Sequence, residues 1–212
     1  VRSMLDQDYA NLEIVLSDDG STDGTFEVMQ ELASDYVGPH MLILNRNAKN
    51  IGIGSQINAA WQKCTGELIV LANGDDISLP NRVEHIVQAW VADGRRAACI
   101  SSAYEIIGPE GDRTGQVVKV AQDFSNIPLS TYNRFCGPNG AAVLAVSRRC
   151  FDQFGPLAAN LILEDGPMNL RSSLIGNWLF INEPLVLYRV HADNISQAYL
   201  PSDFETWKTR HR

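Results

Sequence analysis

Short apolar runs alternate with amphipathic segments through the first half of the chain. The runs are bounded by turn residues and predict strands at residues 13–17, 41–45, 67–72 and 97–101. Between them, apolar residues recur at helical spacing and predict helices at residues 25–36, 55–64 and 80–93. This alternation is typical of an α/β domain with a mostly parallel central sheet flanked by helices.

The second half of the chain is less regular. A turn rich in Gly, Pro and Asp at residues 108–115 is followed by a loop through residues 134–140. Strands are then predicted at 141–146, 178–182 and 185–190, and a helix near 167–175. We expect one domain over residues 1–212, with a regular half at 1–103, an irregular half at 104–200 and a polar tail at 201–212.

Composition and charge exclude several classes of protein. With 212 residues and 45% hydrophobic content, the chain can bury one substantial core. A net charge of -8 argues against a nucleic-acid partner, because binding a phosphate backbone requires clustered Lys and Arg. The four cysteines form no CxxC pair, so we expect reduced thiols in a cytosol. No run approaches the roughly 20 apolar residues that span a bilayer, so any membrane association is expected to be peripheral or to lie outside this segment.

Acidic side chains follow two of the predicted strands. Asp18 and Asp19 come directly after the first strand, whereas Asn73, Asp75 and Asp76 follow the third. Ligands of open α/β sheets bind beyond the carboxyl ends of the strands. The two acidic groups are therefore expected to meet at one edge of the sheet.

The first acidic turn allows three interpretations. Asp19 and Asp23 match the opening of an EF-hand calcium loop, but Gln30 stands where that loop needs a bidentate Glu, and a strand precedes it. A turn in which Asp23 or Thr25 caps the next helix explains part of the motif, but it does not require adjacent carboxylates. Such carboxylates can accept hydrogen bonds from a nucleobase imide and from ribose hydroxyls, which is the functional interpretation.

The second acidic turn presents one amide and two carboxylates at the end of an apolar strand. Oxygen ligands of this kind suit Mg²⁺ or Mn²⁺, which keep some waters and bridge phosphates. An acidic surface turn is the plainer interpretation. The first acidic pair at the same edge favours the metal site.

Five segments together resemble family 2 glycosyltransferases. Residues 18–25 (DDGSTDGT) resemble the strand-end nucleotide motif of that family, and residues 50–58 resemble the N-x-G loop that follows it. Residues 73–75 (NGD) stand where the family carries its DxD metal motif, with Asn73 in place of the first Asp. Glu164 and Asp165 resemble its E-D pair, and residues 188–196 (YRVHADNIS) resemble its C-terminal Y-R-x-H segment.

The resemblance implies the GT-A fold and a role for each motif. Residues 1–103 become the nucleotide-binding half and residues 104–200 the acceptor and catalytic half. The implied nucleotide-binding residues are Asp18, Asp19, Asn50, Asn73 and Gly74. The implied metal site, for Mn²⁺ or Mg²⁺, consists of Asp75, Asp76 and His191, of which His191 contacts either the metal or the diphosphate. Asp165 is implied as the catalytic base, with Glu164 beside it.

Three positions keep two interpretations. Asp165 also suits the N-cap of a helix, since Gly166 and Pro167 resemble a helix start. Gly140 lies where donor sugar and acceptor approach the backbone in the family, although a tight turn explains it equally well. Arg189 is a candidate for contact with the diphosphate or for an ion pair with the acidic cluster.

The implied activity is inverting transfer of a hexosyl or N-acetylhexosaminyl group from a nucleotide sugar, most often a UDP-sugar, to an acceptor hydroxyl. The acceptor would be a saccharide or a lipid-linked molecule in polysaccharide or glycolipid assembly, in the cytoplasm or at the inner face of the cell membrane. A nucleotidyltransferase and a catalytically silent nucleotide-sugar-binding domain are the alternatives. Residues 1–11 resemble the helix that follows the family's first strand, so we expect that strand to be missing from this segment. The oligomeric state is left open.

Overall fold

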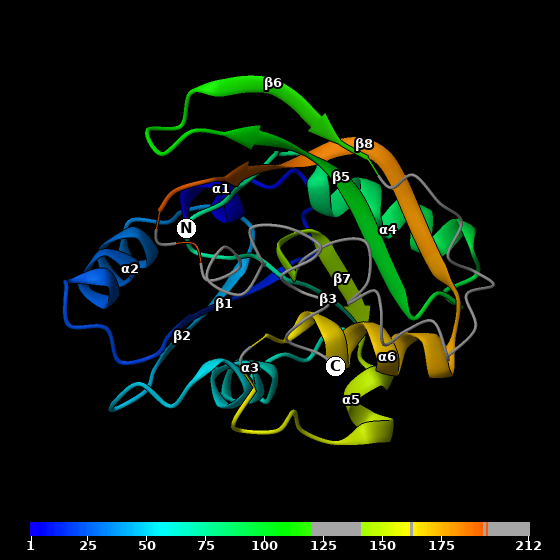
Figure 1. Cartoon of the computed structure of the whole chain (residues 1–212). Helices are drawn as coiled ribbons and strands as arrows, with labels where there is room; N and C mark the ends of the chain where they lie inside the picture. Colours follow the sequence, from blue (N-terminus) through cyan, green and yellow to red (C-terminus); the bar gives the residue numbers. More distant parts are fainter. Residues whose placement is uncertain (120–140, 162, 193, 195–212) are drawn as a thin grey trace, which may run out of the picture.

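A computed structural model describes residues 1–119, 141–161, 163–192 and 194. Eight strands lie in these parts: β1 (Glu13–Asp18), β2 (Met41–Arg46), β3 (Leu68–Val70), β4 (Ile77–Ser78), β5 (Cys99–Ile107), β6 (Arg113–Val118), β7 (Leu144–Ser147) and β8 (Trp178–Arg189). The helices are α1 (Arg2–Leu5), α2 (Thr25–Ser34), α3 (Ile53–Trp61), α4 (Arg82–Ala92), α5 (Arg149–Phe154) and α6 (Asp165–Ile175), with a 3₁₀ turn at Ala141–Val143. Figure 1 shows the helices around a curved sheet.

The strands form two sheets in the described residues. β1 and β2 pair in parallel as a two-stranded sheet. The other is six-stranded, in the order β3-β7-β5-β8-β4, with β6 also paired to β5. The α/β fold class is confirmed, but the expected mostly parallel sheet needs correction, since β5 and β8 form the one parallel pair among the described strands of the larger sheet.

The correction has a topological cause. β7 comes from the irregular half of the chain and lies between β3 and β5, antiparallel to both. β3 and β5 therefore still run in the same direction, as the alternation predicted, but they are not neighbours. β6 follows β5 through a short turn, and a short turn can join only antiparallel strands.

Several element boundaries differ from those predicted. The two apolar runs at residues 178–190 form one strand, β8, whose pairing with β5 shifts register beside Pro184. Proline has no N–H to donate to a ladder, which explains why the sequence favoured a break there. Helix α5 and strand β6 were not predicted: α5 is too short to show helical periodicity, and β6 is mostly exposed polar residues.

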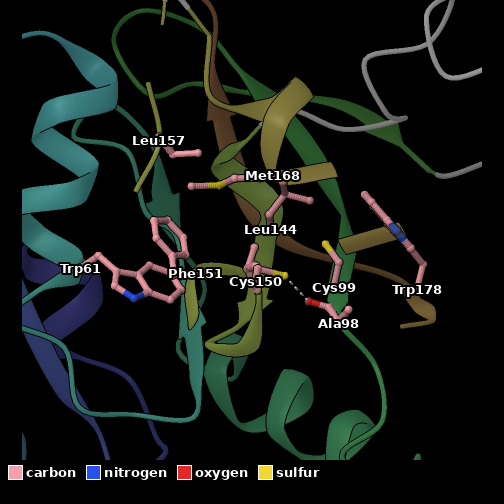
Figure 2. Close-up of a cluster of buried hydrophobic side chains, with 10 residues drawn as sticks. Trp61, Ala98, Cys99, Leu144, Cys150, Phe151, Leu157, Met168 and Trp178 are labelled. Carbon is pink, nitrogen blue, oxygen red and sulfur yellow. Dashed lines mark hydrogen bonds between the residues drawn. The ribbon is translucent and has the colours of Figure 1, made fainter. Parts of the chain in front are cut away.

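Both faces of the six-stranded sheet are covered. Successive residues of β5 and β7 point to opposite faces, so Cys99 lies in one apolar cluster and Ile100 in another. The first cluster joins the sheet to α3, α5 and α6, and in it the rings of Trp61 and Phe151 stack with centroids 3.5 Å apart (Figure 2). The second joins the sheet to α4 through Ile86 and Trp90. The prediction that the tryptophans on apolar faces belong to the core is confirmed for Trp61, Trp90 and Trp178.

Two further features concern the helices and the cysteines. Of the helices in the described parts, none is long and apolar enough to cross a membrane. Cys64, Cys99 and Cys150, the cysteines that fall within the described ranges, are free thiols. Burial raises the pKa of the Cys64 thiol to about 11, so that thiol stays protonated at neutral pH.

Candidate active site

The first acidic turn is closed by its own carboxylate. Asp18, at the end of β1, is 2% exposed, and its Oδ2 accepts hydrogen bonds from the backbone N–H groups of Gly20 (3.2 Å) and Ser21 (3.1 Å). Asp23 accepts from the backbone N–H and the hydroxyl of Thr25 at the start of α2, and these bonds lower the pKa of Asp23. Asp23 thus closes a local turn onto Thr25, but the N-cap of α2 is Gly24, so the helix cap predicted at Asp23 or Thr25 is displaced to the residue between them.

Asp19 joins this turn to the loop that precedes α3. Its Oδ1 accepts from the N–H of Ile51 (3.0 Å), and its Oδ2 accepts from the N–H of Gly52 (3.1 Å). Gly20 has φ +74°, and a Cβ there would lie 2.6 Å from the carbonyl carbon of Lys49. The turn and the loop thus form one surface, to which the exposed Asn50 also belongs.

Uncharged side chains that the sequence did not single out support this surface. Asn47 donates to Asp19 Oδ1 (2.8 Å) and to Gln56 Oε1 (2.5 Å). Gln56, on α3, donates in turn to the carbonyl oxygen of Ser17 (2.9 Å). Asn47, directly after β2, is the part of this network that the sequence could have indicated.

The second acidic turn meets the end of β8. Asp75 Oδ2 lies 3.3 Å from Nε2 of His191, although the two residues are 116 positions apart. The side chains are 39% and 27% exposed, so both can reach a ligand from solvent. Asn73 and Gly74 are exposed in the same turn.

Arg189 holds this turn through backbone groups. Its Nε donates to the Asp75 carbonyl (2.8 Å), and one terminal nitrogen donates to the Pro109 carbonyl (2.6 Å). The backbone N–H of Arg189 donates to Asp76 Oδ1 (2.8 Å). The guanidinium bonds go to carbonyl oxygens, so the two predicted roles of Arg189, contact with the diphosphate and an ion pair with the acidic cluster, both stay predictions.

Asp76 lies deeper than Asp75. Burial raises the pKa of Asp76 to about 6, the hydrogen bond from Arg189 opposes this shift, and the charge of Asp75 adds to it. Its Oδ2 is buried and has no hydrogen-bond partner in the described part of the chain. Its predicted share in metal binding stays a prediction.

Asn194 fixes the turn that carries His191. The side chain is 7% exposed; its Nδ2 donates to the Arg189 carbonyl (3.1 Å) and its Oδ1 accepts from the His191 N–H (2.5 Å). Sequence analysis included this residue in the C-terminal segment but gave it no role of its own. Its position three residues after the histidine is the local signal that could have found it.

Arg82 is a residue that sequence analysis missed. It lies on α4 with 1% exposure and donates to Ser78 Oγ and to the carbonyls of Leu71 and Ala142, each at 2.8 Å. Burial lowers the pKa of Arg82 to about 10, and the charge of Asp76 opposes that shift. The guanidinium thus links the end of β3, just before the acidic turn, to the segment that follows residue 140.

Replacing Arg82 by alanine is expected to destabilise the chain by roughly 3–5 kcal/mol, because it leaves buried carbonyls and the Asp76 carboxylate without their cation. Urea unfolding measures this change. Arg96→Ala is the matched control, since that side chain is 74% exposed and pairs with Asp93, so a loss of at most about 1 kcal/mol is expected. Equal losses in both variants would contradict the role of Arg82.

The E-D pair stands at the start of α6. The helix begins at Asp165, and its N-cap is Glu164, which makes no capping hydrogen bond through its side chain. The predicted cap at Asp165 is therefore displaced by one residue. Burial raises the pKa of Glu164, which favours its protonated form.

Core packing joins α6 to the strand that precedes the acidic turn. Met168, one turn after Asp165, belongs to the same apolar cluster as Leu144 (Figure 2). The Leu144 carbonyl accepts from the N–H of Leu71 at the end of β3 (2.9 Å). Gly140 lies outside the described residues.

The donor set determines which metal could bind. Asp75 and His191 offer one carboxylate and one imidazole, and no group of three or more metal-ligating side chains occurs within the described ranges. Two protein ligands suit an ion that completes its coordination with phosphate oxygens and water, as Mg²⁺ does and Mn²⁺ can. The residues present therefore fit a divalent ion that binds together with a diphosphate.

Comparison with solved structures identifies the fold. The chain superposes on Staphylococcus aureus TarS residues 1–349 in complex with UDP-GlcNAc with a TM-score of 0.70 at 16% identity, covering 94% of this chain and 56% of that one. For the mannosyltransferase PcManGT of Pyrobaculum calidifontis in complex with GDP-Man and Mn²⁺, the TM-score is 0.68 at 18% identity, with 93% and 54% covered. The fold is the GT-A fold that the resemblance implied.

Sequence comparison identifies the family. An uncharacterized glycosyltransferase of Nostoc sp. is 27% identical over 92% of this chain and 60% of its own length. The chondroitin synthase of Pasteurella multocida is 28% identical over 92% of this chain, which spans only 19% of that enzyme. The model of the family described as Glycosyl transferase family 2 matches residues 1–151. The chain therefore belongs to glycosyltransferase family 2.

Proposed function

We propose that this domain is an inverting glycosyltransferase that moves a sugar from a nucleoside diphosphate to an acceptor hydroxyl. The observation that carries the proposal is the pairing of Asp75 with His191, held by Arg189 at the end of the sheet. TarS with UDP-GlcNAc and PcManGT with GDP-Man, which share the fold, support a nucleotide-sugar donor. We favour a UDP-sugar.

The donor's nucleoside would lie on the surface formed by Asp18, Asp19 and the Asn50 loop, with Asn73 and Gly74 on its other side. Asp18 shapes the turn, since its Oδ2 accepts hydrogen bonds from the N–H groups of Gly20 and Ser21. Asp19 shapes the loop by accepting hydrogen bonds from two of its backbone N–H groups. A nucleoside fixed in this way aligns the sugar for in-line attack.

Asp165 would act as the general base. A carboxylate in the first turn of a helix is stabilised in its ionised form, and only that form can accept a proton. As the acceptor oxygen bonds to the anomeric carbon, its proton passes to Asp165. The bond to the diphosphate breaks with its electron pair leaving on the phosphate oxygen, and the anomeric configuration inverts. Glu164, whose pKa burial raises, is the weaker candidate.

Asp75 and His191 would hold a divalent ion, with Mn²⁺ and Mg²⁺ as candidates. When bound, such an ion neutralises charge that builds on the departing diphosphate. Asp76 would chiefly hold the turn in place, since one of its oxygens already accepts from the backbone of Arg189.

The acceptor would be a saccharide or a lipid-linked saccharide, and the sugar transferred a hexose or an N-acetylhexosamine. The chondroitin synthase and hyaluronan synthase among the relatives support polysaccharide assembly. We place the reaction in the cytoplasm, with peripheral association at the inner face of the membrane. The chain spans 60% of the length of the Nostoc relative and 19% of the length of each of these synthases.

Calorimetric titration of UDP tests the donor site. We expect UDP to bind in the presence of Mn²⁺ or Mg²⁺ and to bind at least tenfold more weakly with EDTA, because an ion held by Asp75 and His191 would attract the diphosphate. GDP and ADP, titrated in parallel, serve as controls for the base. Binding that is equally strong with EDTA would contradict the metal site, and binding without turnover of any UDP-sugar would favour a silent binding domain.

A further inference from the structure

We propose that Asn58 is a positioning residue for the catalytic base, which deepens the proposed function and depends on it. Asn58 lies on α3, in the nucleotide-binding half. Its Oδ1 accepts from the backbone N–H of Leu157 (2.8 Å) and its Nδ2 donates to the backbone carbonyl of the same residue (2.9 Å). One amide thus satisfies both backbone groups of a residue 99 positions away.

A second contact on the same face of α3 extends this connection. Gly54 precedes Asn58 by four residues, so the two share one face of the helix. A Cβ at Gly54 would overlap the carbonyl oxygen of Ala158. The glycine therefore lets the backbone that follows Leu157 lie directly on the helix.

The other side of this segment is fastened to α6. Arg171 donates to the carbonyls of Gly155 (2.7 Å) and Pro156 (2.9 Å). Leu157 itself is 3% exposed and belongs to the same apolar cluster as Met168 of α6 (Figure 2). The segment is thus held between α3, through Asn58, and α6, whose first residue is Asp165.

This arrangement connects the donor loop to the base. α3 begins directly after the loop whose backbone N–H groups donate hydrogen bonds to Asp19. Asn58 lies in the last turns of that helix. From Asn58, the hydrogen bonds to Leu157 and the bonds of Arg171 lead to α6. A displacement of about 1 Å at a catalytic group can lower a rate by about 10²-fold. Loss of the Asn58 contacts should therefore lower turnover more than it weakens donor binding.

The test is Asn58→Asp in the full chain. The aspartate keeps an acceptor for the Leu157 N–H but places a second oxygen against the Leu157 carbonyl, which displaces the segment. We expect kcat to fall by about 10- to 100-fold. The KM for the donor and the metal-dependent affinity for UDP should change by at most about threefold, because the Asp75 turn and the Asp19 loop are untouched. Gln62→Ala, an exposed change at the end of the same helix, should leave all these quantities unchanged.

The outcomes separate positioning from stability. A lower melting temperature with unchanged kcat in the folded protein would overturn the proposal, since Asn58 would then serve stability alone. If Asn58→Asp does not fold, Asn58→Ala decides by the same comparison, because it removes both hydrogen bonds without adding charge. Failure of the wild-type chain to bind UDP or to turn over a donor would instead refute the proposed function itself.

Discussion

Asp165→Asn is expected to lower kcat by about 10³-fold, the middle of the range that a positioned general base contributes. An amide keeps the size of the carboxylate but cannot accept the acceptor's proton. Affinity for UDP should stay within about twofold of wild type, because the nucleoside surface is built from other elements.

Single-turnover transfer to the acceptor, with UDP affinity measured alongside, checks this result. Asp152→Asn is the matched control, since Asp152 is an exposed carboxylate on the neighbouring helix α5. Glu164→Gln should have a much smaller effect than Asp165→Asn, because burial raises the pKa of Glu164 and disfavours its ionised form. Full activity in Asp165→Asn, or a larger loss in Glu164→Gln, would assign the base elsewhere.

Asp75→Ala is expected to abolish the metal dependence of UDP binding and to lower kcat/KM by roughly 10³-fold, since the ion's charge stabilisation amounts to several kcal/mol. Removing the carboxylate leaves His191 as the remaining partner of the pair. His191→Ala should therefore show a smaller loss of the same kind, because Asp75 alone keeps one charged ligand.

Titration of UDP with and without Mn²⁺ measures the effect directly. Asp8→Ala removes one negative charge from an exposed position near the N-terminus and serves as the charge control. If Asp75→Ala retained binding that EDTA still weakens, the ion would be held by other groups. Asp76 would then be the first to test, because its Oδ2 has no partner in the described part of the chain.

Local pattern was sufficient to predict the elements that carry the motifs. The apolar runs that became β1 and β2 end at the turn and the loop that the sequence indicated, whereas β3 ends at Val70, before the predicted end at residue 72. The pairing of Asp75 with His191 was implied only by the family resemblance. No periodicity could have brought together side chains 116 positions apart.

Sheet order and the supporting polar residues could not be predicted. The direction of β7 depends on which gap in the sheet it fills, and its own sequence does not encode that choice. Arg82, Asn58 and Asn194 each bind backbone groups. A polar side chain whose partners are distant carbonyls has the same local appearance as an exposed one, so sequence analysis assigned none of the three a role of its own.

The separation of β1 and β2 from the larger sheet has a consequence for how the chain opens. A two-stranded sheet has few neighbouring strands to hydrogen-bond with, so it should open at a lower free energy than the larger sheet. The backbone amide hydrogens of β1 and β2 should therefore exchange with solvent faster than those of β5 and β8. In this pair, β1 ends at Asp18, and β2 ends at Arg46, before the Asn50 loop. A nucleotide bound there would raise that opening free energy by RT ln(1 + [L]/Kd), so ligand occupancy would determine how often this part of the chain opens.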